Sequence, residues 1–129
     1  MTAYLDSSAA VKFVVREIES AALGAWVRDR PRLASSALLW TELMRAVRRG
    51  EPHSIDHARA TIARFNLHAL DPEILDLAGR LDPVGLRSLD AIHLATALRI
   101  AGELEAIVTY DRRMIDGARL LGLPVASPA

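Results

Sequence analysis

The sequence predicts an α/β sandwich with a mainly parallel sheet. Short apolar runs of strand length alternate along the chain with segments whose apolar residues recur at helical spacing. Such alternation is typical of parallel sheets, whose strands are joined by helices and buried on both faces. The 129 residues are 51% hydrophobic and 25% charged, enough for a substantial core. We therefore expect one domain over residues 1–129.

Three strands and four helices are predicted in the first half of the chain. Serines stand at the expected starts of the first, third and fourth helices, Pro31 breaks the second helix and Gly50 ends the third. The apolar residues of the second and fourth helices are expected to face the core. Those residues are Ile18, Ala22, Ala25 and Trp26, and then Ile55, Ala58, Ile62 and Phe65. The expected elements are a strand at 2–5, helices at 9–15 and 18–28, a strand at 32–35, a helix at 36–50, a helix from 54, and a strand at 67–70.

The second half has clearer boundary signals. Asp71 and Pro72 are typical of an N-cap and a first helical residue, and they open a helix that reaches residue 80. Residues 82–85 predict a turn, and Ser88 is expected to cap a helix that runs to about residue 100. A strand at 106–109, a short helix from 111 to Gly122 and an edge strand at 123–125 complete the prediction.

Composition excludes several kinds of site. The chain has no cysteine, which rules out a disulfide framework, a thiolate nucleophile and a cysteine zinc site. Its net charge is +0, so a nucleic-acid partner would have to be held by a local patch. No signal-peptide pattern and no apolar run of membrane-spanning length is present. We therefore expect a cytoplasmic protein without a membrane partner.

Four acidic residues, far apart in the chain, are predicted to meet. Asp6 and Asp111 follow apolar runs of strand type, while Glu42 and Asp90 stand early in largely apolar helices. A carboxylate in such a setting is costly to desolvate unless it is paired, hydrogen-bonded or bound to a metal. In open parallel sheets the carboxyl ends of the strands and the starts of the following helices share one rim. The pattern thus predicts an oxygen-ligand site for Mg²⁺ or Mn²⁺.

Structural roles remain open for each residue taken alone. Asp6 and Asp111 could be helix N-caps, and Asp90 could complement the dipole of its helix. His93, three residues after Asp90, could be a ligand, a general base or a buried structural group.

Five segments, in order, resemble a known family. They are Asp6-Ser7-Ser8-Ala9-Ala10-Val11-Lys12, Trp40-Thr41-Glu42-Leu43-Met44-Arg45-Ala46, Leu89-Asp90-Ala91-Ile92-His93-Leu94-Ala95-Thr96-Ala97, Thr109-Tyr110-Asp111-Arg112-Arg113-Met114 and Gly122-Leu123-Pro124-Val125. Together they resemble the PIN domain, particularly the toxin ribonucleases of the VapC type.

The resemblance implies a three-layer α/β/α sandwich that cleaves RNA with Mg²⁺ or Mn²⁺. It also implies a homodimer and a cognate antitoxin whose tail covers the site. Carried over residue by residue, it makes Asp6, Glu42, Asp90 and Asp111 the acidic, metal-binding and catalytic set. Asp6 and Asp90 are then the expected direct ligands. The same resemblance makes Ser7 and Thr109 the supporting residues.

Arg45, Arg112 and Arg113 lie near these acids in the sequence and are candidates for contacts with RNA phosphates, or else solvated charges. Two other functions compete. A phosphatase would use Asp6 as a nucleophile, but the second aspartate two positions on is missing, since Ser8 stands there. A PIN-like module that binds RNA without cleaving it would not need all four acids.

Overall fold

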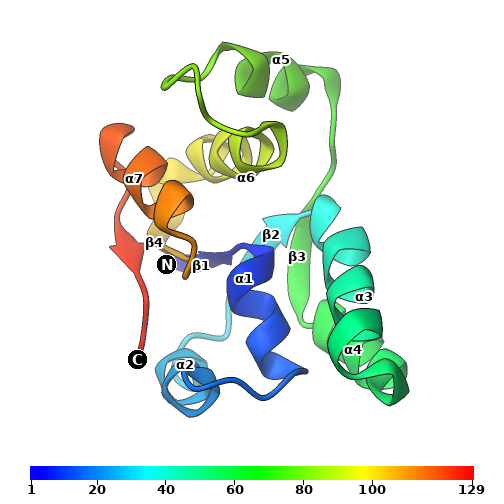
Figure 1. The fold of residues 1–129 in the computed structure, drawn as a ribbon. Helices are drawn as coiled ribbons and strands as arrows, with labels where there is room; N and C mark the ends of the chain where they lie inside the picture. The colour runs from blue at the N-terminus through cyan, green and yellow to red at the C-terminus, as the bar shows by residue number, and fades with distance from the viewer.

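The computed structural model describes residues 1–129, and its centre is a five-stranded sheet (Figure 1). The strands are β1 (Thr2–Leu5), β2 (Leu33–Ser36), β3 (Phe65–His68), β4 (Leu104–Val108) and β5 (Val125–Ala126). All neighbouring pairs are parallel, and the order across the sheet is β3-β2-β1-β4-β5. The predicted α/β sandwich with a parallel sheet is therefore confirmed.

Seven helices and three short 3₁₀ turns connect the strands. The helices are α1 (Ser7–Ala10), α2 (Ser20–Val27), α3 (Leu38–Gly50), α4 (Ile55–Ile62), α5 (Pro72–Arg80), α6 (Ser88–Arg99) and α7 (Arg112–Leu120). The turns are η1 (Val11–Phe13), η2 (Pro52–Ser54) and η3 (Ala101–Glu103). None of the helices is both long and apolar enough to cross a membrane.

The alternation of side chains along β1 separates two cores. Ala3 and Leu5 pack with buried residues of α1 to α4 on one face of the sheet. Tyr4 points to the other face and packs with α6 and α7. A third, small cluster joins α5 to the outer side of α6 through Ile74 and Ala91. Helices thus cover both faces, as the period-2 pattern of a strand buried on two sides requires.

The order of the strands places the site. The chain proceeds from β1 to β2 and β3 on one side and later returns to β4 and β5 on the other. The switch lies between β1 and β4, whose last residues, Leu5 and Val108, are in register. Asp6 directly follows β1, and Asp111 follows β4 as the N-cap of α7. The crevice at the carboxyl ends of such strands is the usual ligand site of an open parallel sheet.

Several predicted boundaries were wrong by a few residues. The first helix begins at Ser7 instead of residue 9 and continues as the 3₁₀ turn η1. Ile18 lies outside α2 and is 93% exposed, so it does not belong to the core face. Phe65 starts β3 instead of ending the helix before it. Arg87, not Ser88, occupies the N-cap position of α6. In each case the pattern of apolar residues was locally ambiguous, and packing in the folded chain decided it.

Candidate active site

Asp6 is held by three hydrogen-bond donors at the end of β1. Its Oδ1 atom accepts from the Ser8 hydroxyl at 2.6 Å and from the backbone N–H of Ala9 at 3.1 Å. Its Oδ2 atom accepts from the Thr109 hydroxyl at 2.5 Å. The side chain is 4% exposed, and burial raises its pKa despite these donors, which lower it. Asp6 is therefore the N-cap of α1. It is also a buried carboxylate that forms no ion pair with a lysine or an arginine.

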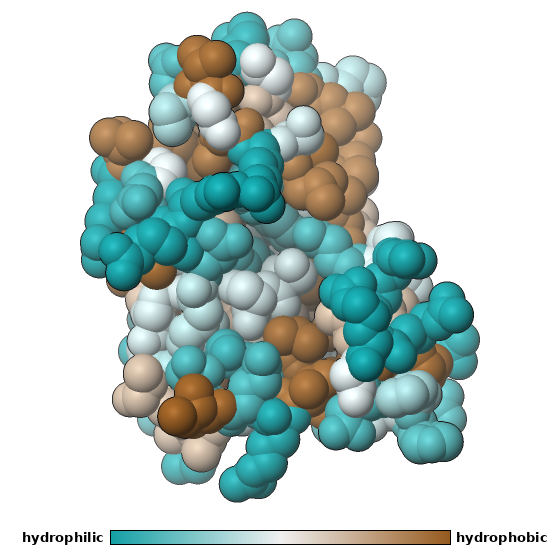
Figure 2. Space-filling view, in the orientation of Figure 1, coloured by the Kyte–Doolittle hydropathy of each residue, from teal (hydrophilic) through white to brown (hydrophobic).

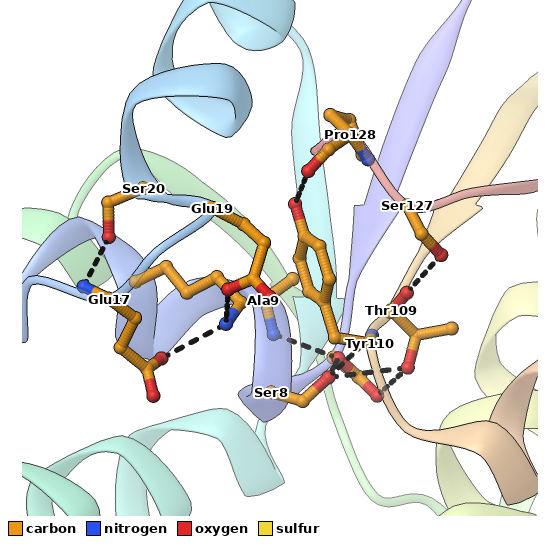
Figure 3. Close-up of polar contacts among 11 residues, drawn as sticks. Ser8, Ala9, Glu17, Glu19, Ser20, Thr109, Tyr110, Ser127 and Pro128 are labelled. Atoms are coloured by element: carbon orange, nitrogen blue, oxygen red, sulfur yellow. Dashed lines mark hydrogen bonds and ion pairs between the residues drawn. The ribbon is translucent and has the colours of Figure 1, made fainter.

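Ser8 and Thr109 join the start of α1 to the segment that follows β4. Their hydroxyl oxygens lie 3.3 Å apart, and the Ser8 hydroxyl also accepts from the backbone N–H of Tyr110 at 3.0 Å (Figure 3). The Thr109 hydroxyl accepts from the N–H of Asp111 at 3.2 Å. The Ser127 hydroxyl donates to the carbonyl of Thr109 at 2.6 Å, so the C-terminal tail also holds this segment. The contacts fix the two strand ends relative to each other.

Asp90 and Asp111 face Asp6 across the switch between the strands. Asp90 lies in the first turn of α6 and is half-buried. Burial raises its pKa most, and the charges of Asp111 and Asp6 raise it further. Asp111 is exposed and accepts from the N–H of Arg113 at 2.8 Å as the N-cap of α7. The charges of Asp6 and Asp111 thus both act on Asp90.

Glu42 reaches the same end of the sheet from the second turn of α3. Its Oε1 atom lies 2.6 Å from Nε2 of His93, one turn after Asp90 on α6. The His93 ring is 2% exposed, and its Nδ1 atom lies 2.6 Å from the hydroxyl of Tyr4. A hydrogen-bonded chain thus runs from the core of the sheet to the acidic rim. Its last member, Glu42, has a side chain that is 19% exposed.

Arginines flank the acids without neutralising them. Glu42, Arg45, Arg49 and Ser8 line a cavity of about 400 Å³ between α1 and α3, together with Ser7, Val11 and Ala46. Figure 2 shows strongly hydrophilic residues over α7 and over α3, on either side of a paler surface above α1. The arginines of α3 and of the start of α7 form no ion pair. They are Arg45, Arg48, Arg49, Arg112 and Arg113.

The chemistry of the four acids suits a hard divalent cation. All four offer oxygen atoms, and no lysine or arginine forms an ion pair with any of them. No group of three or more acidic, histidine or cysteine side chains lies close enough together to hold a metal ion on its own. Mg²⁺ retains several waters and needs only one or two carboxylates. The residues therefore fit such an ion with few direct protein ligands; Asp6 is the most buried of the four acids, and Asp90 and Glu42 are half-buried.

Sequence reasoning missed part of this site. The hydroxyl that bonds Asp6 is that of Ser8, whereas Ser7 forms no side-chain hydrogen bond and lines the cavity beside α3. The contribution of Tyr4 was also missed, although its place two residues before Asp6 puts both on the same face of β1. Thr109 supports Asp6 as expected. The assignment of the four acids to catalysis and metal binding stays a prediction.

Comparisons of sequence give matches along nearly the whole chain. A model of the PIN domain family matches residues 3–120. Ribonuclease VapC46 of Mycobacterium tuberculosis is 48% identical over 126 residues, which cover 98% of this chain and 97% of that protein. Ribonuclease VapC35 of the same organism is 42% identical over 130 residues, which cover 97% of this chain and 96% of the relative.

Solved structures with low sequence identity share the fold. VapC20 of Mycobacterium tuberculosis, a Sarcin-Ricin loop cleaving toxin, has a TM-score of 0.71 at 14% identity and covers 98% of this chain and 99% of its own. A toxin–antitoxin complex from Klebsiella pneumoniae gives 0.71 at 24% identity, with 98% of each chain covered. At these identities the likeness concerns the fold alone.

Proposed function

This chain belongs to the PIN-domain family and to its VapC branch, and from that premise we propose that it is a metal-dependent endoribonuclease. The bond cleaved is an RNA phosphodiester, and the chain acts as the toxin of a toxin–antitoxin pair. One observation carries the proposal. Asp6, Asp90 and Asp111 share one rim, where burial and the charges of Asp111 and Asp6 raise the pKa of Asp90 and the charge of Arg87 lowers it less. No arginine or lysine forms an ion pair with any of the three.

Repulsion among these carboxylates is unfavourable in itself, and a bound cation would relieve it. Mg²⁺ or Mn²⁺ held there would supply positive charge for the phosphate and its leaving group. The chain's own side chains do the positioning. Asp6 cannot rotate, because its two oxygens accept from Ser8, Ala9 and Thr109. Glu42 is held by His93 and faces the cavity beside α3, where it can orient water or contact the cation.

The unpaired arginines suit the RNA phosphates on either side of the cleaved bond. RNA carries one charge per phosphate, and guanidinium groups bind phosphate oxygens bidentately. Arg112 and Arg113 stand at the start of α7 beside Asp111, and Arg45 stands one turn after Glu42 on α3. We assign these three to phosphate contacts on the two sides of the acids. Their removal is expected to raise KM more than it lowers kcat, since they bind substrate and transition state alike.

The partners follow from the family. We propose a cognate antitoxin whose tail inserts a basic side chain among the four acids and so replaces the charge of the cation. We also propose a homodimer and a cytoplasmic location. Exposed apolar residues over α5 and α6, among them Leu75, Val84 and Leu89, offer a surface that a second copy could cover (Figure 2).

A phosphatase with Asp6 as nucleophile is less compatible with the geometry. Both oxygens of Asp6 are occupied by hydrogen bonds, and the side chain is 4% exposed. An aspartyl phosphatase also needs a second aspartate two positions on, and Ser8 stands there and donates to Asp6 instead. A module that binds RNA without cleaving it would gain nothing from the repulsion among the acids.

Cleavage of RNA by purified variants tests the proposal. Asp6→Asn and Asp90→Asn are expected to lose activity in the presence of Mg²⁺ while keeping the fold. Because each removes a charge whose folded pKa is raised, their thermal stability in the absence of metal should equal or slightly exceed that of the wild type. Asp116→Asn, an exposed residue of α7, is the matched control and should remain active. Full activity of either site variant would refute the assignment.

A further inference from the structure

The structure contains a buried pair, Tyr4 and His93, whose role the proposed chemistry leaves open. Tyr4 is completely buried on β1, two residues before Asp6, and His93 is 2% exposed on α6, three residues after Asp90. The pair therefore lies close in sequence to two of the acids, Asp6 just after β1 and Asp90 on α6. The two rings meet edge to face, with centroids 5.8 Å apart and an interplanar angle of 77°.

Both ring nitrogens of His93 are engaged, which restricts where its proton can be. Nε2 lies 2.6 Å from Oε1 of Glu42, and a carboxylate can only accept a hydrogen bond. Nε2 therefore carries the proton wherever this contact is kept. In a neutral imidazole the other nitrogen, Nδ1, is an acceptor, and the Tyr4 hydroxyl at 2.6 Å is placed to donate to it.

The tyrosine is suited to this task because its hydroxyl has a fixed partner. Its side chain is completely buried, and its oxygen lies 2.6 Å from Nδ1 of His93. The Nε2–H group of His93 in turn fixes the orientation of Glu42.

We propose that Tyr4 and His93 are positioning residues, in which the Tyr4 hydroxyl fixes the Nε2-protonated tautomer of His93 and His93 holds Glu42 at the rim. The pair touches neither the substrate nor the cation. Its importance for cleavage rests on the proposed nuclease function, whereas its proton arrangement does not. Partners of this kind around a metal site typically change activity by about 10- to 100-fold when they are removed.

Nitrogen NMR of the histidine-labelled protein tests the arrangement without any assay of activity. In the metal-free wild type near neutral pH, His93 should show a protonated Nε2 and an unprotonated Nδ1, and its signals should be assigned by their loss in His93→Gln. In Tyr4→Phe, which keeps the ring and removes only the hydroxyl, a mixture of tautomers is expected. A proton on Nδ1 of the wild-type ring, alone or in addition to Nε2, would overturn the proposal.

Kinetics supply the second readout. Tyr4→Phe should lower kcat for RNA cleavage about tenfold, because Glu42 loses its fixed orientation in this variant. KM should stay within about twofold of the wild-type value, because the contacts with the substrate remain. Tyr110→Phe is the matched control, since its hydroxyl donates away from the acids, to the carbonyl of Pro128 at 2.6 Å. Unchanged kcat in Tyr4→Phe also overturns the proposal. If the wild type cleaves no RNA with any divalent ion, the nuclease function fails, and the NMR result still decides the positions of the protons.

Discussion

Asp6 and Asp71 are the same residue in the same local role, yet their environments push their pKa values apart. Each accepts the backbone N–H three residues further on, at 3.1 Å and 2.9 Å respectively. Burial dominates at Asp6 and raises its pKa. At Asp71, two hydrogen bonds from the Arg99 guanidinium, at 2.7 and 3.0 Å, are the largest cause, and the pKa falls to about 2. An N-cap therefore reveals little about function until its burial and its partners are known.

The lowered pKa of Asp71 predicts a specific pH dependence of stability. A folded pKa below the unfolded value of about 3.9 stabilises the fold above that pH, and the contribution disappears as pH falls through about 2. Asp71→Asn keeps an N-cap but loses the ion pair with Arg99. We expect it to be less stable than the wild type at neutral pH, with the gap closing between about pH 4 and 2. Thermal unfolding across this range is the measurement, and a gap that persists unchanged at the acid end contradicts it.

At the scale of elements, two helical glycines differ in the space around them. A Cβ atom built on Gly24, inside α2, meets nothing within 4 Å. On Gly117, inside α7, it would lie 3.0 Å from Cδ1 of Leu94 and 3.4 Å from Cδ1 of Leu86. Leu94 is completely buried and has little freedom to move. Gly117 thus lets α7 pack close to α6, whereas Gly24 has no such role.

Alanine substitutions should separate these cases. Gly24→Ala is expected to raise the free energy of unfolding by about 0.5–1 kcal/mol, because alanine loses less backbone entropy in a helix. Gly117→Ala should show no gain or a loss, since the added methyl group strains the contact with Leu94. Urea unfolding of both variants measures the difference. Equal stabilisation by the two would show that α7 does not need the close approach.

Elements were predictable where a local signal coincided with the packing. Asp71 and Pro72 open α5 as expected, and Gly122, with φ of +75°, follows the end of α7. The predictions for Ile18 and Phe65 were wrong because apolar character alone does not say whether a residue lies in a helix, a strand or a connection. The tertiary structure places Ile18 in solvent and Phe65 in β3.

Only those parts of the site that depend on the topology of the sheet could be predicted from the sequence. The rule that ligands bind at the carboxyl ends of parallel strands was enough to place Asp6 and Asp111 at one rim. No rule of sequence indicates that Tyr4 meets His93, 89 residues later in the chain. Nor does the sequence separate Ser7 from Ser8. The choice follows from the direction in which α1 leaves β1, which points the Ser8 hydroxyl at Asp6 and Tyr110.

For the whole molecule, a net charge of zero conceals a strong local separation of charge. Asp6 and Asp111 follow neighbouring strands, the charges of both act on Asp90, and unpaired arginines stand over α3 and α7. Such a surface would attract RNA only over short distances, because salt screens exposed charges beyond about 10 Å. An inhibitor that brings its own basic group to the acids would displace both the cation and the substrate.

Expression in cells tests this account of the partner. The chain alone is expected to arrest growth, and the product of the adjacent gene should relieve the arrest by forming a direct complex. The Asp90→Asn variant is the control and should be harmless alone. Recovery of wild-type, RNA-cleaving protein from cells that grow normally without the neighbour would exclude the toxin function, even if the nuclease function survived.

Cleavage of RNA by the purified chain, first in EDTA and then with single metals added back, tests most directly whether the acidic rim works through a divalent cation. Activity should vanish in EDTA and return with Mg²⁺ or Mn²⁺. Ca²⁺ should not restore it, because it prefers more ligands at longer distances and in looser geometry. Cleavage by the pure protein that persists in EDTA would contradict the proposed mechanism.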